Sequence, residues 1–161
     1  MDRQSLLSEL KQLTVVATTV FTKDLAHGRC RCELTANGPL AAVFRHIGFE
    51  APGCGALSTD QLKTLGENLA NRLHYLLEPV APIEIDSDGV VLQMRSVPPT
   101  DEGNKVRSYY ELLVRSEQLA LRRYTAAQSG SRSDSEMTLT HEIFGRLMTD
   151  LAAAHAEVAS T

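Results

Sequence analysis

The sequence predicts an α+β fold with N-terminal helices, a four-stranded antiparallel β-meander and a C-terminal helix packed on the sheet. Three observations lead to this fold class. Leucines recur at spacings of three and four over 58–77, which is typical of an amphipathic helix. Apolar and polar residues alternate over much of 83–126, as they do in half-buried strands. A second helical stripe covers 140–158. No βαβαβ order is seen, which argues against a doubly wound nucleotide-binding fold.

The first forty residues predict a helix followed by a short strand. Apolar residues three and four apart over 2–22 indicate an amphipathic helix. The β-branched residues of 14–20 leave two alternatives, because the helix either continues through them or ends near Leu13 and is followed by a strand. Over 30–34, two cysteines and a leucine alternate with charged residues, which predicts a short strand that ends at Asn37-Gly38.

The segment from Pro39 to the second helix predicts a short helix and a loop. Proline is favoured in the first turn of a helix and glycine just after its end, so we expect a helix from Pro39 to Ile47 with Gly48 at its C-terminal cap. Residues 48–57 contain three glycines and a proline and predict a loop. Ser58 and Gln61 have the spacing of a capping box, so the helix over 58–77 is expected to begin at Ser58.

The meander is expected to consist of two hairpins. Asp88-Gly89 predicts a tight turn that pairs Ile85 with Leu92 and Glu84 with Gln93. Residues 97–105 contain two successive prolines and predict a longer loop. Strands over about 106–115 and 118–126 follow, with a turn at 116–117. This register predicts four cross-strand pairs: Val114 with Leu119, Leu112 with Leu121, Glu111 with Arg122, and Tyr109 with Tyr124.

The last third of the chain completes the predicted fold. Residues 127–136 are rich in serine, lack core residues and are expected to be a mobile loop. Thr140 can cap a final helix whose apolar stripe covers the sheet. Since 161 residues fall within the usual size of one domain and no repeat is seen, we expect 1–161 to form a single α+β domain.

Composition narrows the possible classes of function. A net charge of -4 disfavours nucleic acid as the main partner, because phosphate binding depends on clustered cationic side chains. Neither a secretory leader nor an apolar run of 18 residues is present, so we expect neither export nor a membrane span. An odd number of cysteines, three, predicts reduced thiols and a cytoplasmic location.

The outer face of the predicted sheet is the first candidate site. Arginine and tyrosine recognise carboxylates and protein surfaces, and Leu113 makes this face less polar than a fully solvated one. Three alternatives remain open: a solvated face, a face buried by a protein partner or second subunit, and a small-ligand site. The candidate partner-binding residues are Arg95, Tyr109, Glu111, Leu113, Arg122 and Tyr124.

Cysteine and histidine residues between 27 and 54 form the second candidate site. The weak candidate metal ligands are His27, Cys30, Cys32 and Cys54, with His46 nearby; their spacing lacks the two closely spaced pairs typical of zinc sites. On a strand, Cys30 and Cys32 share one face and equally fit a hydrophobic core.

Cys54 is the best candidate nucleophile because its glycine-rich loop exposes the thiol. His27, His46 or His74 could serve as its base, and the spacing does not select among them. Phosphate-loop, zincin, serine-hydrolase and EF-hand motifs are absent from the sequence, so we expect no cofactor and disfavour an enzyme.

The sequence therefore favours a bacterial-type, non-catalytic interaction or chaperone-like module that binds a protein partner or forms a homodimer through the outer sheet face. The alternative is a small-molecule-binding protein or enzyme with a Cys/His site in 27–54. In size and charge the chain is similar to bacterial secretion chaperones, which bind effectors as homodimers. Those chaperones interleave a helix within the strand series, whereas four consecutive strands are expected here.

Overall fold

The computed structural model describes residues 3–86, 88, 90–97, 100–101 and 106–161. Their elements are three helices and a single antiparallel sheet. In chain order these are α1 (Arg3–Gln12), β1 (Thr19–Leu25), β2 (Gly28–Asn37), β3 (Ala41–Glu50), α2 (Thr59–Arg72), β4 (Val80–Asp86), β5 (Val91–Ser96), β6 (Thr100–Asp101), β7 (Val106–Val114), β8 (Gln118–Ala127), β9 (Arg132–Ser135), β10 (Met137–Thr140) and α3 (His141–Ala159).

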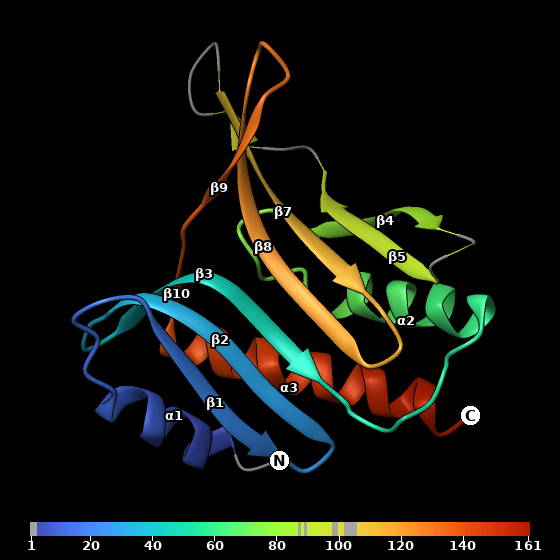
Figure 1. Cartoon of the computed structure of the whole chain (residues 1–161), viewed down its shortest axis with the longest axis horizontal. Helices are drawn as coiled ribbons and strands as arrows, with labels where there is room; N and C mark the ends of the chain where they lie inside the picture. The colour runs from blue at the N-terminus through green and yellow to red at the C-terminus, as the bar shows by residue number, and fades with distance from the viewer. Residues whose placement is uncertain (1–2, 87, 89, 98–99, 102–105) are drawn as a thin grey trace.

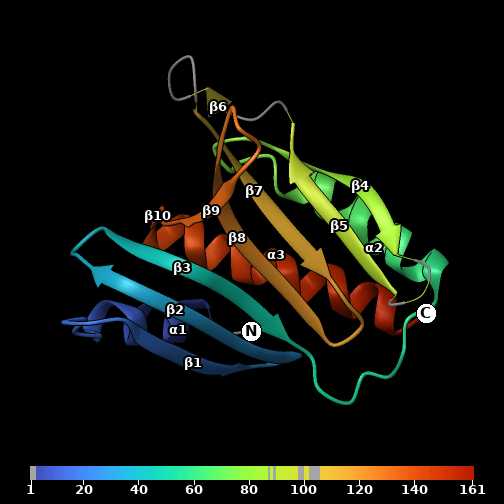
Figure 2. The same ribbon diagram turned by 45° about the horizontal axis from the view of Figure 1, so that its top comes forward.

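The sheet joins two halves of the chain. Its order is β1-β2-β3-β8-β7-β5-β4, with β10 attached to β3, β6 to β7 and β9 to β8. The halves meet where β3 pairs with β8 over only four residue pairs, from Ile47 with Leu121 to Glu50 with Gln118. Beyond this contact the two strands diverge, and the segment 132–140 crosses from β8 to β3 (Figures 1 and 2).

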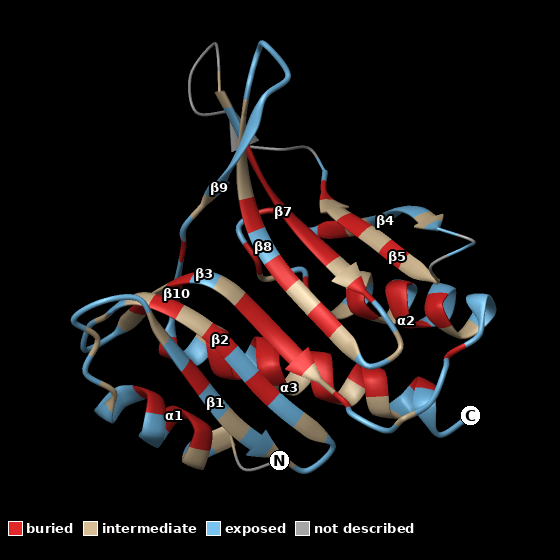
Figure 3. Cartoon of the chain, in the orientation of Figure 1, coloured by how far each residue is buried: buried red, intermediate tan, exposed pale blue. Residues whose placement is uncertain are grey.

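The helices of the described residues all lie on one face of the sheet (Figures 1 and 2). α3 runs behind the middle of the sheet and packs between α1 and α2. The core fills the space between these layers, where Phe44 of β3 stacks on Phe144 of α3 with ring centroids 4.9 Å apart. Buried positions recur at every second residue along much of β2, β5 and β8 (Figure 3). The opposite face of the sheet carries no helix of the described chain and is called the open face below.

The predicted four-stranded meander is wrong, because the sheet is much larger and includes the first half of the chain. Residues 39–47, predicted as a helix, lie mainly in β3. Residues 127–136, predicted as a mobile loop, contain β9, which pairs with β8. α1 ends at Gln12 and β1 follows, so only one helix precedes the sheet. α2 lies between β3 and β4, so the strands are not consecutive but are interleaved by a helix.

Several local predictions are confirmed. Ser58 and Gln61 form the capping box at the start of α2, and the Thr140 side chain accepts a hydrogen bond from the Ile143 amide at the start of α3. Ile85 pairs with Leu92 in the β4–β5 hairpin. All four predicted pairs between β7 and β8 are present. Gly89 of the predicted tight turn lies outside the described residues, as do 98–99 and 102–105 of the predicted loop.

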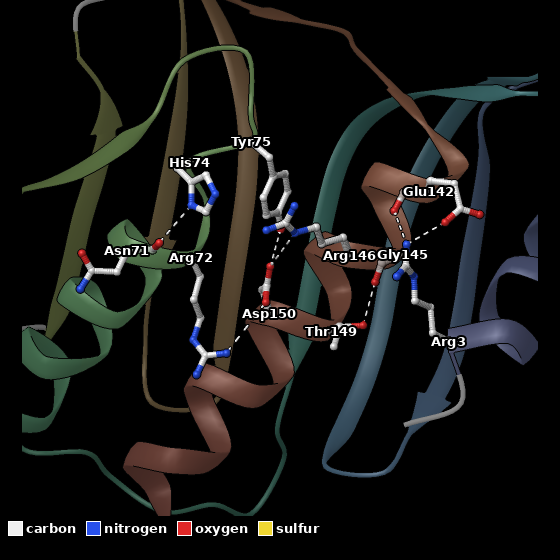
Figure 4. Close-up of polar contacts among 10 residues, drawn as sticks. All are labelled: Arg3, Asn71, Arg72, His74, Tyr75, Glu142, Gly145, Arg146, Thr149 and Asp150. Carbon is white, nitrogen blue, oxygen red and sulfur yellow. Dashed lines mark hydrogen bonds and ion pairs between the residues drawn. The ribbon is translucent and has the colours of Figure 1, made fainter.

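Polar contacts tie the three helices together on the side away from the sheet (Figure 4). The Tyr75 hydroxyl donates a 2.8 Å hydrogen bond to Asp150 of α3, and the Arg146 guanidinium lies 4.1 Å from the centre of the Tyr75 ring. Arg3 of α1 donates to the Glu142 carboxylate at 2.7 Å. Because these contacts pair charged and polar groups of neighbouring helices with one another, we assign this network to helix packing.

Candidate functional site: the open face and a thiol pocket

Glu111 lies at the centre of the open face, although this carboxylate is only 4% exposed. Its Oε2 accepts hydrogen bonds from Gln93 at 2.6 Å, from Arg132 at 3.1 Å and from Arg95 at 3.4 Å. A buried carboxylate needs such donors, because its desolvation is otherwise too costly. The sheet brings the four residues together: Gln93 and Arg95 come from β5, Glu111 from β7 and Arg132 from β9.

Two tyrosines complete this group of side chains. The rings of Tyr109 and Tyr124 lie 5.8 Å apart, centre to centre, across the β7–β8 pair. The Arg95 guanidinium lies 4.8 Å from the Tyr109 ring centre, and that of Arg132 lies 4.2 Å from the Tyr124 ring centre, both within cation–π range. Burial and the nearby Glu111 carboxylate raise the pKa of Tyr124. These six residues are called the Glu111 cluster: Gln93, Arg95, Tyr109, Glu111, Tyr124 and Arg132.

The structure brings together four of the predicted partner-binding residues in this cluster, with Leu113 beside them, and turns Arg122 toward a different partner. Leu113 lies two residues from Glu111 on the same strand and lines a hollow of about 410 Å³ beside the cluster. Arg122 is opposite Glu111 in the strand register, but its guanidinium lies 3.9 Å from Asp134 of β9 instead. Although Glu111 and Arg122 are paired in register as predicted, the ion pairs of Glu111 are with Arg95 and Arg132.

A second hollow lies on the open face between the diverging strands. It has a volume of about 520 Å³ and is lined by Arg122 together with Arg45 of β3. Glu33, Asp134, Ser135 and Glu136 complete its walls. Both signs of charge meet here, so the hollow suits a polar protein segment better than a strongly charged ligand.

Cys30 and Cys32 belong to the core and not to a site. They are 0% and 1% exposed on β2, and their sulfurs are 3.4 Å apart. The neighbouring Cys32 and burial raise the pKa of the Cys30 thiol well above its usual value, which disfavours the thiolate that metals bind. Within the described part of the chain, no group of three or more His, Cys, Asp or Glu residues could hold a metal ion.

Cys54 lies in a separate pocket, together with His27. This pocket has a volume of about 420 Å³ and lies between the β1–β2 turn, the loop after β3 and the C-terminal part of α3. His155 of α3 also lines it, and its Nε2 is 3.8 Å from the Cys54 sulfur. His155 was missed by the sequence analysis. The other two candidate bases lie elsewhere: His46 on β3, where burial lowers its pKa, and His74 beside Tyr75.

The hydrogen bonds of this pocket do not form a cysteine–histidine catalytic pair. His155 Nε2 lies 2.6 Å from the carbonyl oxygen of Ser116, so this nitrogen carries the proton and donates it. The Cys54 thiol donates to the same carbonyl at 2.9 Å. Burial and the Glu117 carboxylate raise the pKa of Cys54. Two donors that share one acceptor cannot act as nucleophile and base toward each other.

We expect Cys54 to be the only thiol that reacts in the folded protein, because Cys30 and Cys32 are buried. Ellman's reagent should modify one thiol per chain under native conditions and three after denaturation. Cys54→Ser should abolish the native reaction, whereas Cys32→Ser should preserve it. A native reaction that persists in Cys54→Ser would contradict the assignment of Cys30 and Cys32 to the core.

Comparisons with protein-family models, with curated proteins and with solved structures find no match to this chain. In the part of the chain that the structure describes, none of the helices has the length and apolar character needed to cross a membrane. Function must therefore be inferred from the geometry of the two sites.

Proposed function

We propose that this protein is a non-catalytic, chaperone-like binding module that engages a protein partner or a second copy of itself through the open face. The observation that carries this proposal is the one-sided placement of the helices, which leaves the middle of a large sheet uncovered (Figure 2). An uncovered sheet face with partly buried apolar side chains is typical of an interaction surface.

The chemistry of the open face supports a protein partner. The Glu111 cluster holds arginine and tyrosine side chains in fixed positions, and these residue types are enriched where protein surfaces bind each other. Because their positions are fixed before binding, little side-chain entropy is lost on association. Leu113 and Val91 are half-buried beside the cluster and add apolar area.

The order of elements also supports a chaperone-like role. Bacterial secretion chaperones interleave a helix within the strand series, and in this chain α2 lies between β3 and β4. Together with the acidic charge and small size, this order fits a cytoplasmic homodimer that binds client proteins.

The proposal is tested by two substitutions on the open face. Leu113→Asp places a charge among the apolar contacts, and Arg122→Glu replaces one of the two cations of the second hollow with a carboxylate. We expect both variants to keep the wild-type circular dichroism spectrum but to lose the dimer or the co-purified partner in native mass spectrometry. Matched control substitutions lie off this face: Val16→Asp, at a residue 94% exposed, and Lys63→Glu on the solvent side of α2.

Native mass spectrometry of protein purified without chelators also tests the alternative. A retained metal or small molecule that is lost in Cys54→Ser would favour a binding site in the thiol pocket. If the two open-face variants and the two controls all keep the wild-type mass and partners, the proposed use of the open face is wrong.

A further inference from the structure

His141, the first residue of α3, is 2% exposed. The Asn37 side chain links it by hydrogen bonds to the end of α1. The His141 Nε2 lies 2.9 Å from Oδ1 of Asn37, the last residue of β2. The Asn37 amide nitrogen donates hydrogen bonds to the carbonyl oxygens of Leu10 at 2.7 Å and Leu13 at 2.9 Å. Leu10 is in the last turn of α1 and Leu13 follows directly after it, where the helix provides too few N–H donors for its last carbonyl oxygens.

The direction of these hydrogen bonds fixes the protonation state of His141. Since Asn37 Nδ2 faces two carbonyl oxygens, it must be the amide nitrogen, and Oδ1 must then accept from His141. The proton of the neutral imidazole is therefore on Nε2. Nδ1 is buried and has no hydrogen-bond partner among the described residues, so it carries a free lone pair in this state.

A second proton on His141 would be unfavourable in this environment. It would add an N–H group at Nδ1, for which the described part of the chain offers no acceptor, and a positive charge at the N-terminal end of α3, which is already the positive end of the helix dipole. Burial and then the nearby Lys11 ammonium lower the pKa of His141, and Glu142 raises it.

The other charged groups near His141 do not compensate. The Glu142 carboxylate forms an exposed ion pair with Arg3. The strand segments packed around the imidazole contain no charged residue that faces it. These segments are Asn37 of β2, the turn 38–40, the start of β3 and all of β10. Lys11 from α1 and Glu142 from α3 are therefore the charged groups that face the imidazole.

We propose that His141 is a pH-sensitive latch that holds the C-terminal end of α1 against β2 and α3, and that protonation of its imidazole releases this end. When α1 opens, Asn37 and His141 become accessible to water and the imidazole can take up a proton freely. A helix of ten residues is too short to persist in water once undocked, so the opened segment loses its backbone hydrogen bonds. This inference is independent of the proposed use of the open face.

The sign of the pH dependence follows from the lowered pKa. The neutral His141 imidazole stabilises the docked form of α1 fully above pH 6.5, the usual pKa of an imidazole exposed to water. This stabilisation is lost as the pH falls toward the lower pKa that His141 has in the docked form. At pH 5.5 an imidazole with a pKa of 6.5 is about nine-tenths protonated, so the opening equilibrium of α1 should rise relative to pH 7.5, by at most about tenfold.

Hydrogen exchange of the full chain tests this latch. Protection factors of peptides covering 3–13 are measured at pH 7.5 and 5.5, after correction for the intrinsic pH dependence of exchange. The wild type should lose protection at pH 5.5, by at most about tenfold, whereas His141→Gln, whose amide nitrogen can replace Nε2 as donor but cannot become charged, should show no loss. His74→Gln, at an exposed histidine, should behave as the wild type does.

A wild type without a pH response in 3–13, or a His141→Gln variant that keeps the full response, would overturn the latch. If His141→Gln does not fold, NMR titration of the wild-type His141 ring still decides the question. A pKa below 6.5 supports the latch, and a pKa of 6.5 or above contradicts it.

Discussion

Arg123→Met should lower the free energy of unfolding by about 3–5 kcal/mol, because it leaves the Glu78 carboxylate buried without its main ion-pair partner. The two side chains form a bidentate pair with both N···O distances at 3.0 Å, and each side chain is less than one tenth exposed. The Arg123 guanidinium also lies 4.5 Å from the centre of the Tyr110 ring. This pair fastens the segment between α2 and β4 to β8, on the side of the sheet that the helices cover.

Urea unfolding followed by circular dichroism measures this effect, and the adjacent arginine provides the control. Arg122 points to the open face, is 44% exposed and lies 3.9 Å from Asp134, so Arg122→Met should change stability by less than about 0.5 kcal/mol. The double variant Glu78→Leu with Arg123→Met should be more stable than Arg123→Met alone, because no unpaired charge stays buried. Equal unfolding midpoints for Arg122→Met and Arg123→Met would refute the importance of the pair.

Local patterns predicted the elements in which short-range chemistry decides the structure. The pairing of β7 with β8 followed from alternation on both sides of a short turn, and the Arg115 amide does donate to the Gln118 carbonyl there at 2.8 Å. The start of α2 followed from Ser58 and Gln61, whose capping bonds involve residues only three positions apart. Such features depend little on the rest of the chain, so one sequence is sufficient to predict them.

β3 was predicted as a helix because Pro39 and Gly48 are typical of a helix start and a C-terminal cap, and an irregular strand does not contradict such a pattern. Phe44 and Ile47 are both fully buried although they are three residues apart, a spacing typical of one helix face. In the structure, β2 and β3 shift register here: Glu33 is paired with His46, and Leu34 is paired with Phe44. The intervening Arg45 has no residue opposite it, so Phe44 and Ile47 face the same side. A bulge depends on the partner strand, which cannot be read from β3 alone.

The candidate sites were predicted only in part for a similar reason. Glu111 and Tyr109 were placed on one face by their alternation along β7, but Arg132 was not assigned to that face because its serine-rich segment resembled a loop. His155 approaches Cys54 only when α3 packs against the loop after β3, 101 positions away in the sequence. Contacts between such distant segments leave no local pattern. His155 could have been noticed only as a polar residue within the apolar stripe of α3.

The second large effect is expected from Phe44→Ala, which should lower the free energy of unfolding by about 3–5 kcal/mol. The Phe44 ring is fully buried and stacks on Phe144, so its removal leaves a cavity between β3 and α3 and deprives both rings of their contact. The position is critical because β3 pairs with β2, β8 and β10 and so joins the two halves of the sheet.

Leu40→Ala is the matched control, since it also shortens an apolar side chain next to β3 but at a residue that is 80% exposed. Its unfolding midpoint in urea should stay close to that of the wild type. Phe44→Leu should fall between the wild type and Phe44→Ala, because leucine refills part of the cavity. If Phe44 instead lay at an exposed position, Phe44→Ala and Leu40→Ala would have similar small effects on the unfolding midpoint.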